Sequence, residues 1–237
     1  MAGAGESQII EIHRLHLTDV TPAPYLPWTR PTFPVFAYLV MHATGPMLID
    51  TGVGVRSALI DELYSPIHHD LDEAVERHGV RVDDITTVIT SHLHFDHCGH
   101  NNRFARSTIF VQRAEVEAAT AEMYTVPEWA FPPGVDLTVI DGDHQVASDV
   151  TIVSTPGHTP GHQSVLIDVG DSTRTIVCCQ AAWNTNSFAV ATLGDDGWDQ
   201  TVGATSLERL HATVPDLRRR HQHHLPRAEP QSGSHLR

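Results

Sequence analysis

Apolar residues occur along the chain in short runs whose spacing predicts an ordered series of strands and helices. Residues 7–17 alternate between apolar and polar, which is the period of a strand with one buried face. Apolar, β-branched runs predict further strands in the first half of the chain over 35–43, 46–52, 84–92 and 107–112. Apolar positions at helical spacing predict helices over 56–65, 70–79 and 114–123.

The second half of the chain continues this pattern with three closely spaced apolar runs and one amphipathic segment. The runs predict strands over 150–157, 164–170 and 173–180, and the segment predicts a helix over 206–214. The sequence contains no internal repeat and no linker that separates two folding units. We therefore expect one α/β domain over residues 1–216.

Composition narrows the class of protein. The formal net charge is −14, and because nucleic acids and anionic membranes bind basic faces, neither partner is expected. No apolar run approaches the ~20 residues of a membrane span, and no charged, apolar leader opens the chain. Cys178 and Cys179 are adjacent and resemble part of a buried strand rather than a disulfide framework. A cytoplasmic protein is therefore expected.

Residues 217–237 form a tail whose composition differs from that of the preceding chain. The tail is rich in Arg and His and contains one acidic residue, Glu229. Three consecutive arginines, 218–220, do not fit a buried strand. Natural divergence and a shifted reading frame are both open explanations for this tail.

Histidines cluster at the end of one predicted strand. The segment SHLHFDHCGHN, residues 91–101, places His92 and His94 two positions apart, so an extended backbone points both side chains the same way. Asp96 and His97 follow in the expected turn. Zinc and similar ions bind neutral imidazole nitrogen and carboxylate oxygen, and catalytic sites keep one position for water. The spacing therefore predicts part of a metal site.

A second turn with histidine follows the predicted strand that begins at Val150. The segment STPGHTPGH, residues 154–162, places His158 in a turn built by proline and glycine. Taken alone, this segment is also compatible with a loop that contains incidental histidines. Together with the first cluster, it indicates that a distant loop supplies the remaining ligands of a metal site.

These motifs resemble the metallo-β-lactamase superfamily over roughly residues 7–216. The resemblance rests on H-x-H-x-D-H, on the later T-P-G-H turn and on the upstream segment LIDTG. Within the superfamily, SHLHFDHCGHN and PGHTPGHQSVLI are most similar to the N-acyl homoserine lactonase branch. The resemblance implies an αββα sandwich of two mixed β-sheets flanked by helices, with metals at one edge of the paired sheets.

The resemblance also implies a set of metal ligands, and one or two divalent ions such as zinc as cofactors. The positions carried over to this chain are His92, His94 and His158 for the first metal and Asp96 and His97 for the second. Asp50 matches the family's aspartate that orients ligands through hydrogen bonds.

Three positions depart from the lactonase pattern. Gln180 stands where two-metal relatives have a bridging Asp, and an uncharged amide bridges two cations poorly. Trp183 replaces a tyrosine that contacts the substrate, and its indole can donate one hydrogen bond but cannot act as an acid. The last ligand falls in the tail, where His223 is the preferred candidate and His221 and His224 are alternatives.

The activity implied by the resemblance is the opening of a lactone, of the N-acyl homoserine lactone type, by a metal-bound hydroxide that attacks the carbonyl. Asp96 is expected to orient or deprotonate the attacking water. Aromatic side chains are expected to contact a small-molecule acyl lactone or ester. The candidate contacts are Trp28, Phe33, Trp129, Phe131 and Trp183. Relatives with this fold also suggest a homodimer.

Two alternatives use the same ligand pattern. A thioester or ester hydrolase of the glyoxalase II type has this motif, although the basic patch that binds glutathione is not found in this sequence. A catalytically impaired metal-binding relative is also compatible with Gln180 and Trp183. Lactone hydrolysis that is lost with a chelator and in His94→Ala distinguishes an enzyme from such a relative.

Overall fold

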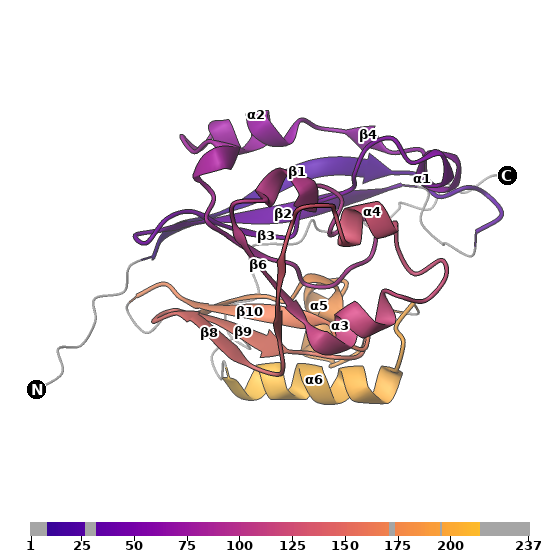
Figure 1. The fold of residues 1–237 in the computed structure, drawn as a ribbon. Coiled ribbons are helices and arrows are strands. Elements are labelled where there is room, and N and C mark those ends of the chain that lie inside the picture. The colour runs from indigo at the N-terminus through magenta and orange to yellow at the C-terminus, as the bar shows by residue number, and fades with distance from the viewer. Residues whose placement is uncertain (1–8, 27–31, 171–173, 195, 214–237) are drawn as a thin grey trace, which may run out of the picture.

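Two β-sheets pack face to face in the computed structural model, which describes residues 9–26, 32–170, 174–194 and 196–213 (Figure 1). The larger sheet has the strand order β4-β1-β2-β3-β5-β6-β7, and the smaller sheet has the order β11-β10-β9-β8. The strands of the larger sheet are β1 (Ile9–Val20), β2 (Phe33–His42), β3 (Met47–Ile49), β4 (Ile67–His68), β5 (Thr87–Ile89), β6 (Thr108–Gln112) and β7 (Leu137–Ile140). Those of the smaller sheet are β8 (His144–Ala147), β9 (Val150–Ser154), β10 (Gln163–Asp168) and β11 (Arg174–Val177).

Helices cover the outer faces of this pair of sheets. Helix α2 (Leu71–Glu76) lies over the larger sheet, and α6 (Gln200–Thr213) lies under the smaller one (Figure 1). Apolar clusters join each of these helices to its sheet. The layers therefore follow the predicted αββα order.

The larger sheet is mixed. β1, β2 and β3 pair antiparallel, whereas β3, β5, β6 and β7 run parallel to one another. Parallel strands of this kind are covered on both faces, and Ile49, Val88 and Ile89 are accordingly fully buried. The smaller sheet is antiparallel in all its described pairs, because short connections join neighbouring strands. The expectation of two mixed sheets therefore holds only for the larger sheet.

Apolar side chains of both sheets form the central core. Val40, Ile49 and Ile89 of the larger sheet pack with Ile152 and Val165 of the smaller sheet. Burial of one such side chain stabilises a fold by about 1.5–3 kcal/mol. This core therefore fixes the position of one sheet relative to the other.

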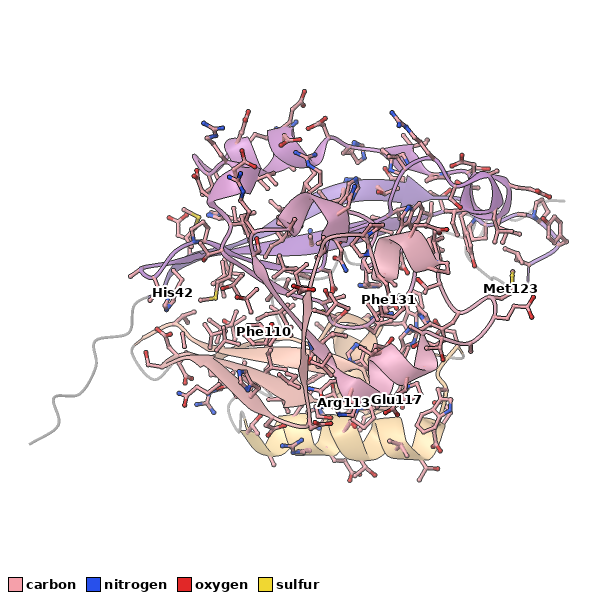
Figure 2. The ribbon with its side chains drawn as sticks, in the orientation of Figure 1. His42, Phe110, Arg113, Glu117, Met123 and Phe131 are labelled. Atoms are coloured by element: carbon pink, nitrogen blue, oxygen red, sulfur yellow. The ribbon has the colours of Figure 1, made fainter. Side chains whose placement is uncertain are left out.

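One buried polar pair also connects the sheets. His42 ends β2, and its Nε2 lies 2.9 Å from Oδ1 of Asp149, which lies between β8 and β9. Both residues are buried. Figure 2 shows His42 at the margin where the two sheets meet.

Helices occur where the sequence predicts them, but their lengths differ. α1 (Ala58–Tyr64) and α2 lie inside their predicted ranges, and the side chains of Ser57 and Asp70 cap their first turns. α3 (Arg113–Ala118) is shorter than predicted, because Thr120 donates its hydroxyl to the carbonyl of Glu117 in a turn that ends the helix. α6 begins earlier than predicted, after the Asp199 side chain accepts hydrogen bonds from two backbone nitrogens.

Several short elements have no counterpart in the sequence prediction. They are the strands β4, β7 and β8, the helices α4 (Pro127–Ala130) and α5 (Thr185–Ala189), and the 3-10 turns Val82–Asp84 and Asn101–Phe104. A further 3-10 turn, Cys179–Ala181, replaces the end of the strand predicted over 173–180, because β11 ends at Val177. Segments of two to five residues are too short for a repeating apolar pattern to identify them. Trp28, His223 and the tail 217–237 lie outside the described residues. Within the described part, no helix has the length and apolar character needed to cross a membrane.

Candidate metal centre

The two predicted histidine turns meet at one edge of the sandwich. The chain leaves β5 at Ile89 and enters the first turn, while the second turn connects β9 to β10. Gln163, the first residue of β10, donates its backbone nitrogen to the carbonyl of Ser91 at 2.9 Å. Its side-chain amide donates to the carbonyl of Thr90 at 2.8 Å. Hydrogen bonds between the two sheets thus hold the two turns together.

Three imidazoles converge where these turns meet. Nδ1 of His94 lies 3.1 Å from Nε2 of His92 and 3.2 Å from Nε2 of His158. One ligand atom of each of the three residues lies within 4.8 Å of the others. Nitrogens that bind one tetrahedral zinc ion at about 2.0–2.1 Å are separated by roughly 3.3 Å. The three nitrogens therefore have the spacing of ligands to a single cation.

The protonation of these imidazoles also suits a metal. Burial and neighbouring histidines lower the pKa of His94 and of His158 to about 4, and the same causes hold the pKa of His92 well below its usual value. Neutral imidazole offers a lone pair to a cation. The residues present therefore fit a divalent cation by spacing, donor type and charge state.

Asp96 and His97 form the second predicted group of ligands beside His92. Ligand atoms of these three buried residues also lie within 4.8 Å of one another. Oδ2 of Asp96 lies 3.3 Å from Nε2 of His97. Burial alone raises the pKa of Asp96, but the charge of His97 outweighs burial and lowers it to about 2. Asp96 is therefore an ionised carboxylate at neutral pH.

Asp50 orients His97 and the start of the first ligand turn through hydrogen bonds. Its Oδ2 accepts a hydrogen bond from Nδ1 of His97 at 2.8 Å, and its two oxygens accept bonds from the backbone nitrogen and hydroxyl of Ser91 at 2.6 and 2.9 Å. Asp50 has a backbone φ of +63°, a left-handed conformation that costs a non-glycine residue about 1–3 kcal/mol. Burial lowers the pKa of His97, but the carboxylates of Asp96 and Asp50 outweigh burial and raise the pKa to about 10.

Glu115 is a residue of the site that the sequence analysis missed. It lies on α3 and is fully buried. Oε1 accepts hydrogen bonds from the Leu93 nitrogen at 2.8 Å and from the Tyr124 hydroxyl at 2.5 Å. Oε2 accepts bonds from the Thr159 hydroxyl at 2.6 Å and from the Gly161 nitrogen at 3.1 Å. One carboxylate therefore joins the turn that carries His92 and His94 to the turn that carries His158. A helix with several acidic residues gives no sign of which one is buried.

Two of the positions that depart from the lactonase pattern, Gln180 and Trp183, lie at the same site. Gln180 lies beside His158, and its buried Oε1 has no hydrogen-bond partner among the described residues. Trp183 donates Nε1 to Oδ1 of Asp196 at 3.0 Å. Oδ2 of Asp196 lies 3.7 Å from Nδ1 of His158. Asp196, which the sequence analysis also missed, thus faces the ring atom of His158 opposite the one near His94.

The predicted substrate contacts are only partly brought together. Phe33 is buried and packs edge-on against Trp183, with ring centroids 6.2 Å apart. Trp129 of α4 and the following Phe131 pack in an apolar cluster that includes Leu93 of the first ligand turn. Figure 2 shows Phe131 close to α4. An apolar contact with substrate at these aromatic residues stays a prediction.

Glycines allow the first ligand turn to approach its neighbours closely. A Cβ on Gly99 would lie 1.8 Å from the backbone nitrogen of Gly54, so the two segments can touch only without side chains there. The backbone nitrogen of Gly99 donates to the carbonyl of Gly52 at 2.8 Å. Cys98 packs in this turn, and its thiol lies 3.3 Å from the carbonyl oxygen of His94. The glycines after Asp50 therefore serve this contact.

Fold and site together define the class of protein. Residues 30–179 match the family model described as the metallo-beta-lactamase superfamily, and the chain belongs to this superfamily. The resemblance noted in the sequence is confirmed.

Several proteins similar to this chain are named N-acyl homoserine lactonases. An N-acyl homoserine lactonase of Bacillus sp is 34% identical over 193 residues, 76% of this chain and 76% of the relative. The N-acyl homoserine lactonase AttM of Rhizobium radiobacter is 28% identical, over 73% of this chain and 72% of the relative. A solved structure of an N-acyl homoserine lactone hydrolase, with the product N-hexanoyl-L-homoserine at its catalytic metal center, is similar with a TM-score of 0.75. It is 26% identical and the match covers 90% of this chain and 91% of that chain.

Proposed function

We propose that this protein is a metal-dependent hydrolase that opens the lactone ring of N-acyl homoserine lactones. The observation that carries the proposal is the convergence of His92, His94 and His158 at ligand spacing, with ionised Asp96 beside them. The names of the relatives supply the substrate class. A cytoplasmic location and a homodimer stay predictions from the sequence.

Each residue of the site has a distinct part in this proposal. His92, His94 and His158 would hold the cation, and its Lewis acidity would lower the pKa of a water toward ~7 and polarise a carbonyl oxygen. Asp50 fixes the ring of His97 through the 2.8 Å hydrogen bond at Nδ1 and leaves Nε2 directed toward Asp96. Glu115 and Asp196 hold the ligand turns in place.

Asp96 handles the proton in the proposed reaction. The attacking water oxygen forms a bond to the lactone carbonyl carbon, and the carboxylate of Asp96 accepts the proton that this water loses. The ring C–O bond then breaks, and the proton returns to the departing alkoxide oxygen. The product is an N-acyl homoserine with a hydroxyl group and a new carboxylic acid, which releases its proton to the solvent and becomes a carboxylate. Because the pKa of Asp96 is lowered to about 2, it holds this proton only briefly.

Trp183 and Gln180 determine how this chain differs from the two-metal pattern. The indole of Trp183 has its one donor occupied by Asp196, so it offers a flat apolar face to a substrate. Gln180 supplies an uncharged amide where a bridging carboxylate lies in two-metal relatives. We therefore propose that the site formed by His92, His94 and His158 binds a cation more tightly than the adjacent group of Asp96 and His97 does.

Metal content and lactone hydrolysis together test the proposed function. The protein is purified without a His-tag, its metals per chain are counted by mass spectrometry, and ring opening of N-hexanoyl homoserine lactone is followed by proton release. We expect activity that a chelator abolishes and that zinc restores, and loss of activity by more than 100-fold in His94→Ala, in line with the size of metal-ion catalysis. The matched control is His68→Ala, because His68 is exposed and lies on β4.

Each outcome of this test has a definite meaning. Activity that survives both the chelator and His94→Ala contradicts a metal mechanism. Metal binding without any lactone hydrolysis contradicts the lactonase proposal and favours the impaired relative. Hydrolysis of a glutathione thioester in preference to the lactone favours the glyoxalase II alternative.

A further inference from the structure

A second group of metal-binding side chains lies at the edge of the larger sheet and shares no residue with the candidate metal centre. His16 and Asp19 belong to β1, and His69 directly follows the edge strand β4. Nε2 of His16 lies 3.0 Å from Oδ1 of Asp19, and Nε2 of His69 lies 3.1 Å from Oδ2 of Asp19. One ligand atom from each residue lies within 4.8 Å of the others. The group thus contains two imidazoles around one carboxylate.

A β-bulge brings the two residues of β1 together. Residues three positions apart in a regular strand point to opposite faces of the sheet. The register of β1 against β2 shifts between His16 and Thr18, so Leu17 is an extra residue. This shift places His16 and Asp19 on the same face. The backbone nitrogen of His69 donates to the carbonyl of Leu17 at 2.8 Å, which brings its side chain to the same place.

The three side chains are accessible and partly fixed in orientation. Their exposed fractions are 42% for His16, 31% for Asp19 and 43% for His69. The ring of His16 packs against the rings of Phe36 and His69, with centroid distances of 5.3 and 4.4 Å. Burial tends to raise the pKa of Asp19, but the hydrogen bonds and charges of the two histidines outweigh it and lower the pKa. An ionised carboxylate therefore lies between two solvent-accessible imidazoles.

We propose that His16, Asp19 and His69 form a separate surface site for a divalent first-row cation such as Zn²⁺. Two imidazoles and one carboxylate are a donor set that such ions favour, and three protein ligands leave the remaining positions to water. Ligand atoms around one zinc ion are separated by roughly 3.3 Å, close to the 3.0 and 3.1 Å distances here. An ion at this site ties the two-residue strand β4 to β1 and thereby stabilises the edge of the sheet.

Zinc titration of the full-length protein tests this site. The candidate metal centre is first filled with zinc, free metal is removed by gel filtration, and ZnCl₂ is then titrated by calorimetry. We expect the wild type to bind a further equivalent whose affinity falls at least tenfold in the double variant His16→Gln, His69→Gln. Zinc should raise the Tm of the wild type more than that of the double variant, because a ligand stabilises only the state that binds it. Lactone hydrolysis should be equal in the two proteins.

Zinc bound at this site can be told apart from zinc bound elsewhere on the protein in two ways. His68→Gln removes the exposed histidine next to His69 and should retain the extra equivalent. Zinc bound by histidines of the tail 217–237 is the same in every variant and contributes no difference between them.

A second measurement uses Cu²⁺ as the probe, since its electron paramagnetic resonance spectrum reports nitrogen ligands directly. Nitrogen coupling that is present in the wild type and lost in the double variant supports the site. Equal zinc uptake and equal copper spectra in the wild type and the double variant overturn it. If the double variant is not folded by circular dichroism, Asp19→Asn replaces it, and this variant should show the same loss because it removes the anionic ligand.

Discussion

Oε1 of Glu115 accepts a 2.8 Å hydrogen bond from the backbone nitrogen of Leu93, the residue between His92 and His94. Oε2 of the same carboxylate binds the hydroxyl of Thr159, which directly follows His158. The geometry of the three-histidine site therefore depends on a carboxylate whose two oxygens are both occupied by hydrogen bonds. Positions of this kind commonly change metal affinity or activity by about 10–100-fold when they are mutated.

Glu115→Gln should weaken zinc binding by about 10–100-fold, because one side of the amide carries N–H groups where the carboxylate accepts hydrogen bonds. The measurement is competition for zinc with a chelator of known affinity, accompanied by kcat at saturating zinc. Glu117→Gln is the matched control, since Glu117 is exposed on the same helix (Figure 2). Equal zinc affinity in wild type and Glu115→Gln contradicts the role of Glu115 in positioning the turns.

Gln180→Asp should create a stronger second metal site. The buried Oε1 of Gln180 has no hydrogen-bond partner within the described chain, and the residue contacts His158. A carboxylate there adds a negative charge and a bridging ligand, so metal content should rise from about one to about two ions per chain, as in two-metal sites. Metal analysis by mass spectrometry after gel filtration provides the count. A wild type that already holds two tightly bound ions shows instead that the amide suffices.

Asp196→Asn tests a positioning role at His158. The carboxylate lies 3.7 Å from Nδ1 of His158 and accepts a hydrogen bond from Trp183. Loss of the carboxylate should lower zinc affinity by about tenfold, because a carboxylate partner strengthens a histidine ligand. The diagnostic readout is recovery of kcat when zinc is raised. If kcat stays low at saturating zinc, Asp196 acts on the substrate side through Trp183 and not through the metal.

The parts of the site that could be predicted are those whose residue type is itself the signal. His92, His94, Asp96, His97 and His158 stand in motifs that few proteins need for any other purpose, and the structure brings all five together. The strands that carry them have β-branched, apolar sequences that also identify buried elements.

The parts that escaped prediction depend on tertiary contact. Glu115 and Asp196 are ordinary acidic residues in sequence, and only the packing of α3 and of the segment after α5 places them beside histidine turns. The cluster of His16, Asp19 and His69 requires a bulge in β1 and a two-residue strand. Neither feature has a pattern that a single sequence displays, since a bulge shifts the alternation by one residue only.

The buried pair His42 and Asp149 offers a test of how the two sheets are held together. The two residues lie 107 positions apart in the chain, and Nε2 of His42 lies 2.9 Å from Oδ1 of Asp149. If one partner is removed, the other stays buried but loses this hydrogen bond, which costs about 1–3 kcal/mol. His42→Ala should therefore lower the free energy of unfolding by at least that amount, as measured by urea denaturation.

A double-mutant cycle distinguishes this pair from general loss of packing. If the hydrogen bond matters, His42→Ala and Asp149→Ala together should destabilise the protein by less than the sum of the two single changes, with a coupling of about 0.5–3 kcal/mol. His68→Ala controls for loss of a histidine at an exposed position of the larger sheet, where changes are usually within about 0.5 kcal/mol. Strict additivity of the two buried changes would show that the sheets are joined by the apolar core alone. Coupling would instead assign part of the inter-sheet stability to this polar contact.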